Sequence, residues 1–346
     1  MKVKIGDLTK IKTGKLDANV SSEDGKYPFF TCSKEPLKIS TYSYDCECVL
    51  VAGNGDLNVK YYNGKFDAYQ RTYIIEANGS GKLYMPYLYY FMEDYIDELR
   101  KQAIGGVIKY IKLANLTDAL IELPSVDEQK SIVEILKKVK GILDKRNDEI
   151  RELDNLIKAR FVEMFGDCTN MISLSDLCLI ITDGTHQSPK FQHEGIPFIL
   201  VSNLSKNTVT YDTDKFISAE TYKELYKRTP IEIGDILLST VGSYGHPAVV
   251  VEDRKFLFQR HIAYLKPKSD ILNSYYMHGA LLSPGCQRQI EEKVKGIAQK
   301  TLNLSEIRKI RIPVPSLDLQ KQYADFVHQV KEHNPHTLFL CYLAFL

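Results

Sequence analysis

The chain has 346 residues, of which 44% are hydrophobic and 26% are charged, so it is long enough for two ordinary domains with a core each. Its formal net charge is only +1, which is less than expected of a protein that grips DNA alone by neutralising phosphates. No stretch approaches the roughly 18 apolar residues of a membrane span, Met1–Asp7 lacks a signal-peptide core and the seven cysteines include no CxxC pair, so we expect a cytoplasmic protein with reduced thiols and no membrane partner.

The first part of the chain predicts a module of mixed strands and helices. A strand at 49–52 runs into the turn Gly53-Asn54-Gly55, and a second strand, rich in aromatic and β-branched residues, covers 69–76. A helix is predicted over 86–101, because Pro86 suits a first helical turn. A Gly-led basic turn at 105–110 follows. Strands and helices without strict alternation indicate an α+β fold.

A long helix is predicted next, starting at the capping box Ser125-Val126-Asp127-Glu128. About 40 residues at ~1.5 Å each make it ~60 Å long. Its apolar positions are spaced four and three apart in alternation, which is the coiled-coil pattern: the predicted seam is Ile132, Leu136, Val139, Leu143, Ile150, Leu153, Ile157 and Met164, with Arg146 and Arg160 in register. An amphipathic helix lying on a globular core shows a similar stripe, but the length and the charged remaining faces favour the coiled coil.

The rest of the chain repeats the first part. Leu123–Lys130 matches Val314–Lys321 at an offset of 191, since 314 − 123 = 191, and Gly105 and Lys109 then fall on Gly296 and Lys300. Further upstream the offset becomes 189, which places Gln70-Arg71 on Gln259-Arg260 and Gly53 on Gly242. The strand and helix signals recur in the same order, with strands at 235–239 and 261–266 and a helix at 273–282. The chain is therefore predicted to be a duplicated module with internal pseudo-symmetry.

The second copy predicts a helix that is much shorter than the first. An apolar face continues for about 15 residues from Ser316, and the segment 331–336, including the helix-stopping Pro335, then interrupts it. We divide the chain into a first module at 1–122, a spacer helix at 123–166, a second module at 167–313, a truncated second spacer helix at 314–331 and a divergent apolar tail at 332–346. We expect the seam from about Arg146 to Met164 to lack an intramolecular partner.

The ordered, duplicated set of motifs resembles the specificity subunits of type I restriction-modification systems. Both copies end on Leu/Val-Pro-Ser-x-Asp-x-Gln-Lys followed by a helix, and Gly25–Phe29, Asp183–His186 and Gly195–Ile199 look like the openings of that family's target-recognition domains. The resemblance covers about residues 1–330. It implies two recognition domains that each read one half of a split, asymmetric site in double-stranded DNA, on two helices that pack antiparallel and fix the separation.

The same resemblance implies that the chemistry belongs to partners. Methyltransferase subunits would dock on the helices and methylate adenine at N6 with S-adenosylmethionine, and restriction (motor) subunits would use ATP and Mg²⁺ to cut unmodified DNA. In this chain we expect no catalytic residue, no cofactor site and no metal site. The sequence has no GxxxxGK loop and no HExxH, and a zinc site at Cys46 and Cys48 needs two further ligands that are not evident nearby.

Base reading requires side chains such as Arg, Lys, Gln and Asn near a groove, and glycine turns let the backbone approach phosphates. The candidate DNA-contacting residues are Asn54, Gln70, Arg71, Lys109, Tyr110, Thr185, His186, Ser243, Tyr244, Gln259, Arg260, Gln299 and Lys300. Each has a structural alternative, as part of a turn or as an arginine paired with a core carboxylate.

Three other interpretations remain open at this point: a coiled-coil scaffold that binds protein, a truncated or silent specificity cassette whose unpaired helix self-associates, and an enzyme with an unrecognised site.

Overall fold

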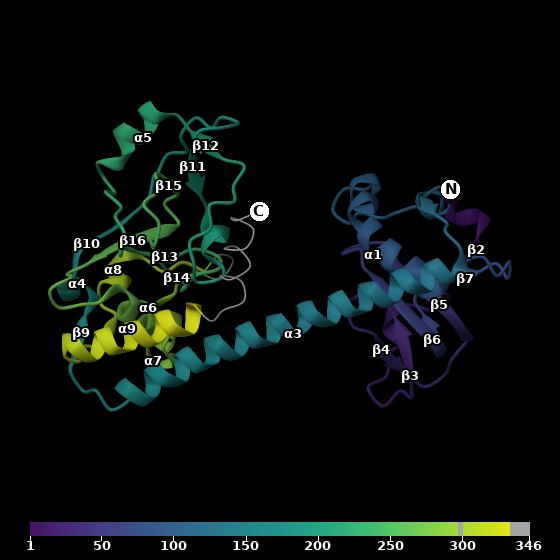
Figure 1. Cartoon of the computed structure of the whole chain (residues 1–346), viewed down its shortest axis with the longest axis horizontal. Coiled ribbons are helices and arrows are strands. Elements are labelled where there is room, and N and C mark those ends of the chain that lie inside the picture. The colour runs from purple at the N-terminus through teal and green to yellow at the C-terminus, as the bar shows by residue number, and fades with distance from the viewer. Residues whose placement is uncertain (297–299, 333–346) are drawn as a thin grey trace. The chain divides into compact units, whose positions relative to one another are not determined.

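The computed structural model describes residues 1–296 and 300–332, which form two compact units at 1–145 and 146–346 (Figure 1). Helices and strands are mixed in both units, so the predicted α+β class is confirmed. The first unit contains β1 (Lys2–Lys4), η1 (Ile5–Asp7), β2 (Thr9–Thr13), η2 (Ala18–Val20), β3 (Tyr27–Phe30), β4 (Leu37–Ile39), β5 (Tyr44–Ala52), β6 (Val59–Ala68), β7 (Thr72–Ala77), α1 (Met85–Gln102), α2 (Leu113–Thr117) and β8 (Leu120–Glu122). The helix α3 (Val126–Phe165) passes from this unit into the next.

The second unit repeats this order with three additional elements, η3, α5 and α7, and without a counterpart of η2. Its elements are β9 (Met171–Ser173), α4 (Leu174–Leu177), β10 (Cys178–Asp183), β11 (Ile196–Ile199), η3 (Val201–Leu204), β12 (Phe216–Ile217), α5 (Ala219–Tyr226), β13 (Ile236–Ser239), β14 (Pro247–Val249), β15 (Leu257–Phe258), β16 (Ile262–Pro267), α6 (Ser274–Leu282), α7 (Pro284–Lys293), α8 (Leu304–Ile307), β17 (Arg311–Pro313) and α9 (Leu317–Glu332).

Sheet topology confirms the internal repeat. The first unit has the strand order β2-β7-β5-β6-β3-β4, in which only the β3–β6 pair is parallel. The second unit has β10-β16-β13-β14 and β12-β11-β15, again with one parallel pair, β11–β15. The long strand β6 corresponds to β14 and β15 together, because residues 250–256 leave the sheet there. A small pair, β1–β8 or β9–β17, closes each unit.

The repeated Pro-Ser-x-Asp-x-Gln motif places a buried glutamine at the start of each spacer helix. Gln129 donates from Nε2 to the carbonyl oxygens of Lys82 (2.8 Å) and Pro124 (2.9 Å), and its Oε1 accepts from the Tyr84 amide (2.8 Å). Gln320 makes the equivalent three bonds to Ile271, Pro315 and Asn273, and both glutamines are 0% exposed. Each side chain therefore ties the start of its helix to the loop before α1 or α6. The bonds are kept because a buried amide without partners is costly.

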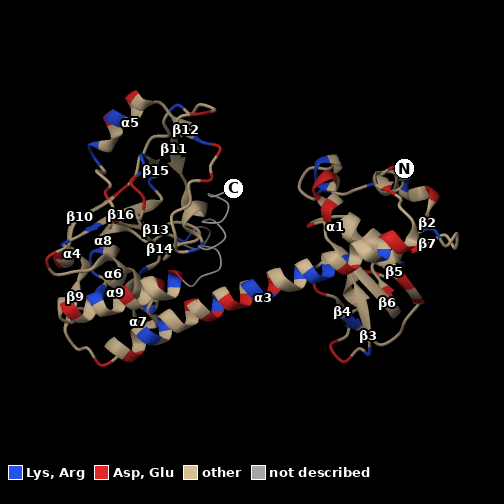
Figure 2. Ribbon diagram, viewed as in Figure 1, with Lys and Arg blue, Asp and Glu red and all other residues tan. Residues whose placement is uncertain are grey.

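The predicted capping box is present at the start of α3, where Ser125 N donates to Glu128 Oε2 at 2.8 Å. From 134 to 149 every residue of α3 is exposed, so the alternative of an amphipathic helix lying on a core is wrong for this stretch. Figure 2 shows charges of both signs along α3. Ion pairs three residues apart, such as Lys137–Glu134 and Arg146–Glu149, join side chains on this exposed stretch, where solvent screens their attraction.

The helix α9 lies beside the end of α3, and the two run antiparallel (Figure 1). The Tyr323 ring is 5.4 Å from Phe161 and 5.7 Å from Phe165, and Phe326 lies under the Arg160 guanidinium at 5.7 Å. The prediction that the seam from Arg146 to Met164 lacks a partner is therefore wrong for its C-terminal part. It failed because an antiparallel α9 begins beside the C-terminal end of α3.

The predicted seam divides into two parts with different surroundings. Ile132, Leu136, Val139 and Leu143 are 36–58% exposed, and α3 contacts α1 in this stretch through Lys140, whose ammonium lies 3.2 Å from the Glu93 carboxylate. Ile150, Leu153, Ile157 and Met164 are partly buried. The most buried residues of this part are Phe161 and Phe165, at 4% and 2% exposure, and they were not in the predicted seam. The predicted tail at 332–346 lies outside the described residues except for Glu332, which ends α9.

Candidate nucleic-acid interface

In the first unit, four segments meet at one edge of the sheet, and we call them loop cluster 1: residues 13–17, 53–56, 69–71 and 104–110. Backbone hydrogen bonds join them. Gly14 N donates to Thr72 O (3.0 Å) and Gln70 N to Leu16 O (2.9 Å), which fixes the first segment to the third. Gly53 N donates to Arg71 O (2.7 Å), Gly55 N to Lys109 O (2.9 Å) and Ile111 N to Gly53 O (2.9 Å). Each segment has exposed residues; the first three connect strands, and the fourth connects α1 to α2.

Loop cluster 2, formed by residues 183–186, 240–245, 259–261 and the described part of 295–301, has the same five bonds. Gly184 N donates to Ile262 O (3.1 Å) and Arg260 N to Thr185 O (3.1 Å). Thr240 N donates to His261 O (2.9 Å), and the last two bonds join Gly242 N to Lys300 O (3.1 Å) and Leu302 N to Thr240 O (2.8 Å). One backbone frame is thus built twice.

These bonds correct the register of the repeat near the loops. Lys109 and Lys300 are equivalent, as predicted. Gln70 corresponds to Arg260, and Arg71 to His261, so the predicted pairing of Gln70-Arg71 with Gln259-Arg260 is wrong by one residue.

Gly242 corresponds to Gly55, and not to Gly53 as predicted. Both have the left-handed φ that favours glycine, +71° and +70°. The predictions followed identical side chains, whereas the frame is set by backbone groups.

Polar side chains of loop cluster 1 are held by partners from other segments. Asn54 accepts at Oδ1 from the Cys32 thiol (2.9 Å), and Gln70 donates to Asp17 Oδ1 (2.7 Å). Three further residues of this cluster are exposed to solvent: Arg71, Lys109 and Tyr110, the last with 39% exposure. The structure therefore brings together all five predicted residues of this unit.

Loop cluster 2 surrounds a hollow of about 510 Å³. Its lining residues come from all four segments, from the residues just after the fourth and from the start of α8: Asp183, Thr240, Val241, Arg260, His261, Thr301, Leu302, Asn303, Leu304 and Ser305. Arg260 Nε donates to His261 Nε2 at 3.3 Å. Burial and the neighbouring Arg260 charge both lower the pKa of His261, so its imidazole favours the neutral form. A neutral imidazole offers one donor and one acceptor to a ligand.

The other predicted residues of the second unit occupy the same edge. The Lys300 ammonium lies 6.0 Å from the centre of the Tyr244 ring, and Ser243 is exposed beside it. Thr185 forms a parallel bridge with Gln259, which makes Gln259 part of the frame and the equivalent of Tyr69. Gln299 lies outside the described residues.

Sequence reasoning missed an ion cluster at the edge of this hollow. Asp183, known from the sequence only as part of a turn, is bonded by Arg228 Nη2 at 2.6 Å and lies 2.9 Å from His186 Nε2. Arg228 is 45 positions away along the chain, in a segment that the repeat pattern does not cover, so no sequence signal pointed to it.

Two kinds of feature are absent from the described residues: a cluster of metal-ligating side chains and a helix that could span a membrane. No group of three or more His, Cys, Asp or Glu side chains gathers there in a way that fits a metal ion. Burial raises the pKa of the Cys46 thiol and that of Cys48, which opposes the thiolate form that metals bind. Within the same residues, no helix has the length and apolarity to cross a bilayer.

The sequence matches the family described as the type I restriction modification DNA specificity domain, over residues 1–153 and again over 169–336. The two matched segments are the two copies of the repeat. The chain belongs to this family. The predicted resemblance to type I specificity subunits is thereby confirmed.

Similar proteins include two specificity subunits of Escherichia coli type I restriction enzymes. That of EcoDI is 37% identical over 156 residues, which are 45% of this chain and 34% of that protein. That of EcoBI is 24% identical over 317 residues, which are 82% of this chain and 66% of that protein. The chain thus matches one third of the first relative and just under two thirds of the second.

A solved structure has the same fold. It is the S subunit of a type I restriction-modification system from M. genitalium, which superposes with a TM-score of 0.57 and 17% sequence identity, covering 97% of this chain and 90% of that one. The predicted architecture of two repeated domains joined by a long helix is confirmed.

Proposed function

We propose that this chain reads DNA sequence for a type I restriction-modification complex, with each loop cluster reading one half of a bipartite, asymmetric site. One observation carries the proposal: the two clusters share one backbone frame but present different side chains on it. Gln70 stands where Arg260 stands, and Arg71 where His261 stands. Because the backbone frames are alike, equivalent residues of the two clusters would meet DNA in the same position. Because their side chains differ, they would select different bases.

The lysine that is the same in both clusters supports a division of labour. Lys109 and Lys300 hold the adjacent glycine turn through their backbone carbonyls, so their exposed side chains take no part in the frame. A point charge on a flexible stem suits phosphates, which are the same in both half-sites, while bidentate side chains suit bases. The proposal assigns the two lysines to phosphates and Asn54, Gln70, Arg71 and Arg260 to bases.

Partners supply the catalysis in this proposal. Methyltransferase subunits, which use S-adenosylmethionine, dock on the exposed part of α3, where Ile132, Leu136, Val139 and Leu143 form an apolar row. Restriction subunits, which use ATP and Mg²⁺, join that assembly. The near-zero net charge fits a reader whose partners contribute to holding the DNA. No residue of this chain is assigned a catalytic role, and the complex works in the cytoplasm.

A gel-shift experiment tests the proposal. The full chain is mixed with its methyltransferase partner and with labelled genomic fragments, and binding to each fragment is compared. Retention of a subset of fragments at salt concentrations that release the rest supports sequence reading. Equal binding to all fragments, or none, contradicts the proposal. If the chain binds the methyltransferase partner but retains no DNA fragment, the result favours the coiled-coil scaffold, for which the apolar row of α3 is the structural basis.

A further inference from the structure

A carboxylate at the end of a strand holds two basic side chains beside the hollow of loop cluster 2. Asp183 is the last residue of β10, where it pairs with Ala263 of β16, so its backbone is fixed by the sheet. Its side chain is 17% exposed, whereas those of Arg228 and His186, which contact its two oxygens, are about half exposed. The carboxylate thus lies behind two basic groups that face the solvent.

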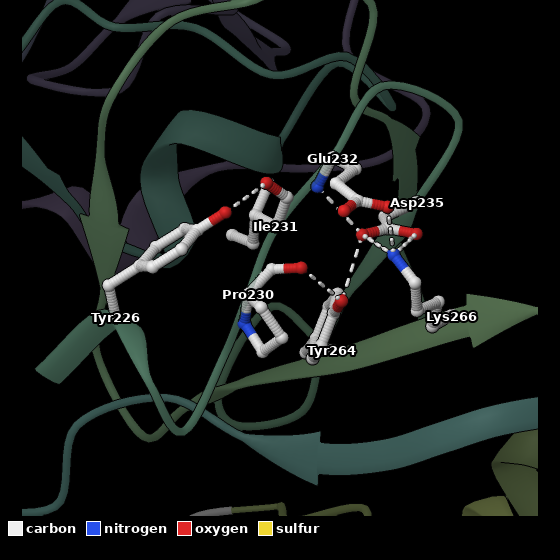
Figure 3. A network of polar contacts seen from close by, with 7 residues as sticks. All are labelled: Tyr226, Pro230, Ile231, Glu232, Asp235, Tyr264 and Lys266. Carbon is white, nitrogen blue, oxygen red and sulfur yellow. Dashed lines mark hydrogen bonds and ion pairs between the residues drawn. The ribbon is translucent and has the colours of Figure 1, made fainter.

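The segment that carries Arg228 is anchored at several points immediately after it. Figure 3 shows the Tyr264 hydroxyl within hydrogen-bonding distance of the Pro230 carbonyl (2.9 Å) and of Asp235 Oδ2 (2.8 Å). Lys266 bonds Glu232 (2.7 Å) and Asp235 (3.2 Å).

The buried carboxylate of this segment is stabilised by its hydrogen-bond partners. Burial raises the pKa of Asp235, and the bonds from Glu232 N, Tyr264 and Lys266 partly offset this rise. Together with Thr229, which is 4% exposed, these contacts hold the segment in one conformation.

The first unit has no counterpart of this segment. There, β4 ends at Ile39 and β5 begins at Tyr44, whereas in the second unit β12 ends at Ile217 and β13 begins at Ile236. The additional residues form α5 and the anchored segment that ends in Asp235. The second unit therefore has one more basic side chain at its loop cluster than the repeated frame provides.

We propose that Arg228 reads a base in the half-site of the second unit, that the base is guanine, and that Asp183 is its positioning residue. The inference rests on the proposed function. The guanidinium has five N–H donors, and its bond to Asp183 commits one of them, so a fork of donors remains for the O6 and N7 acceptors of guanine. The paired carboxylate cancels most of the attraction of Arg228 to phosphate, which leaves hydrogen-bond geometry as its main contribution.

The test uses the cell that makes the chain, so that every partner is present, and reads adenine methylation across its genome. Strains carry the unchanged gene, a deletion, or the variants Arg228→Lys, Arg228→Ala and Asp183→Asn. Lys227→Ala is the matched control, because Lys227 is exposed, adjacent and makes no ion pair in the described residues. Arg228→Lys keeps the charge and removes the fork, and equal urea midpoints of the purified variants show that each is folded.

We expect Arg228→Lys to lower methylation of the parent motif by about 5- to 150-fold and to relax one guanine in one half-site, since a bidentate arginine discriminates to that extent. Asp183→Asn relaxes the same position to a smaller degree, which a merely structural role does not produce. The other half-site and the control stay unchanged.

An unchanged motif in Arg228→Lys, relaxation at a base other than guanine, or a uniform loss in Arg228→Ala with the motif intact overturns the inference. A parent strain without chain-dependent methylation instead overturns the proposed function and the inference with it.

Discussion

Replacing Gln129 by alanine removes the side chain that ties the start of α3 to the loop before α1. The change leaves the carbonyls of Lys82 and Pro124 and the amide of Tyr84 without their partner, at a site that is 0% exposed. Gln320 offers an internal duplicate of the experiment, because it makes the same three bonds in the second unit.

The expected loss follows from the number of orphaned groups. A buried polar group that loses its partner costs about 1–3 kcal/mol, and three such groups that share one site are not fully additive. We therefore expect the free energy of unfolding of the affected unit to fall by about 3–5 kcal/mol, which is a large part of the roughly 5–15 kcal/mol that stabilises a typical domain.

Hydrogen exchange measured by mass spectrometry assigns the loss to a unit, and urea titration by circular dichroism measures its size. Because the units have separate cores, Gln129→Ala is expected to speed exchange in β5 and β7 and leave β13 and β16 unchanged, and Gln320→Ala does the reverse. The control is Lys130→Ala, because the Lys130 side chain is exposed and its ion pair among the described residues, with Asp127, is exposed as well. A loss below about 0.5 kcal/mol for both glutamine variants refutes the reasoning.

Three further predictions use other features of the fold. Lys109→Ala and Lys300→Ala are each expected to reduce the salt dependence of DNA binding by about one charge without changing the motif, measured by fluorescence anisotropy over a salt series; an unaltered slope contradicts the phosphate assignment. Burial, aided by the Lys331 charge, lowers the pKa of His278 to about 4, so its neutral form is favoured in the folded state and stability falls as pH drops from 6.5 towards 4. Between pH 7 and pH 5, urea titration should show about 2 kcal/mol less loss in His278→Gln than in the parent, and equal losses count against this. Gly242→Ala is expected to cost about 1 kcal/mol by urea titration because of its left-handed φ; a neutral result shows that the turn adapts.

The regular elements were predictable because their signals are local. The capping box located the start of α3, and the helices predicted at 86–101 and 273–282 agree with α1 and α6 to within one residue at each end. The repeated Pro-Ser-x-Asp-x-Gln motif marked the two buried glutamines, although the sequence alone did not show that they pack inside.

The contacts around the loops were less predictable because they depend on the backbone and on distant residues. The frame of the loop clusters joins N–H and C=O groups, so identical side chains such as Gln70 and Gln259 misled the alignment by one residue. Arg228 reaches Asp183 only through a segment that the first copy lacks. The direction of α9, and hence which part of α3 it covers, is likewise set by tertiary packing.

The central claim is that this chain selects DNA sequence through two unlike copies of one frame. Sequencing of methylated adenines in the cell with the gene intact and with the gene deleted tests it most directly. We predict one bipartite motif, with two different halves at a fixed spacing, that is methylated only when the chain is present. Methylation that does not depend on the chain, or a motif with a single half, contradicts the account.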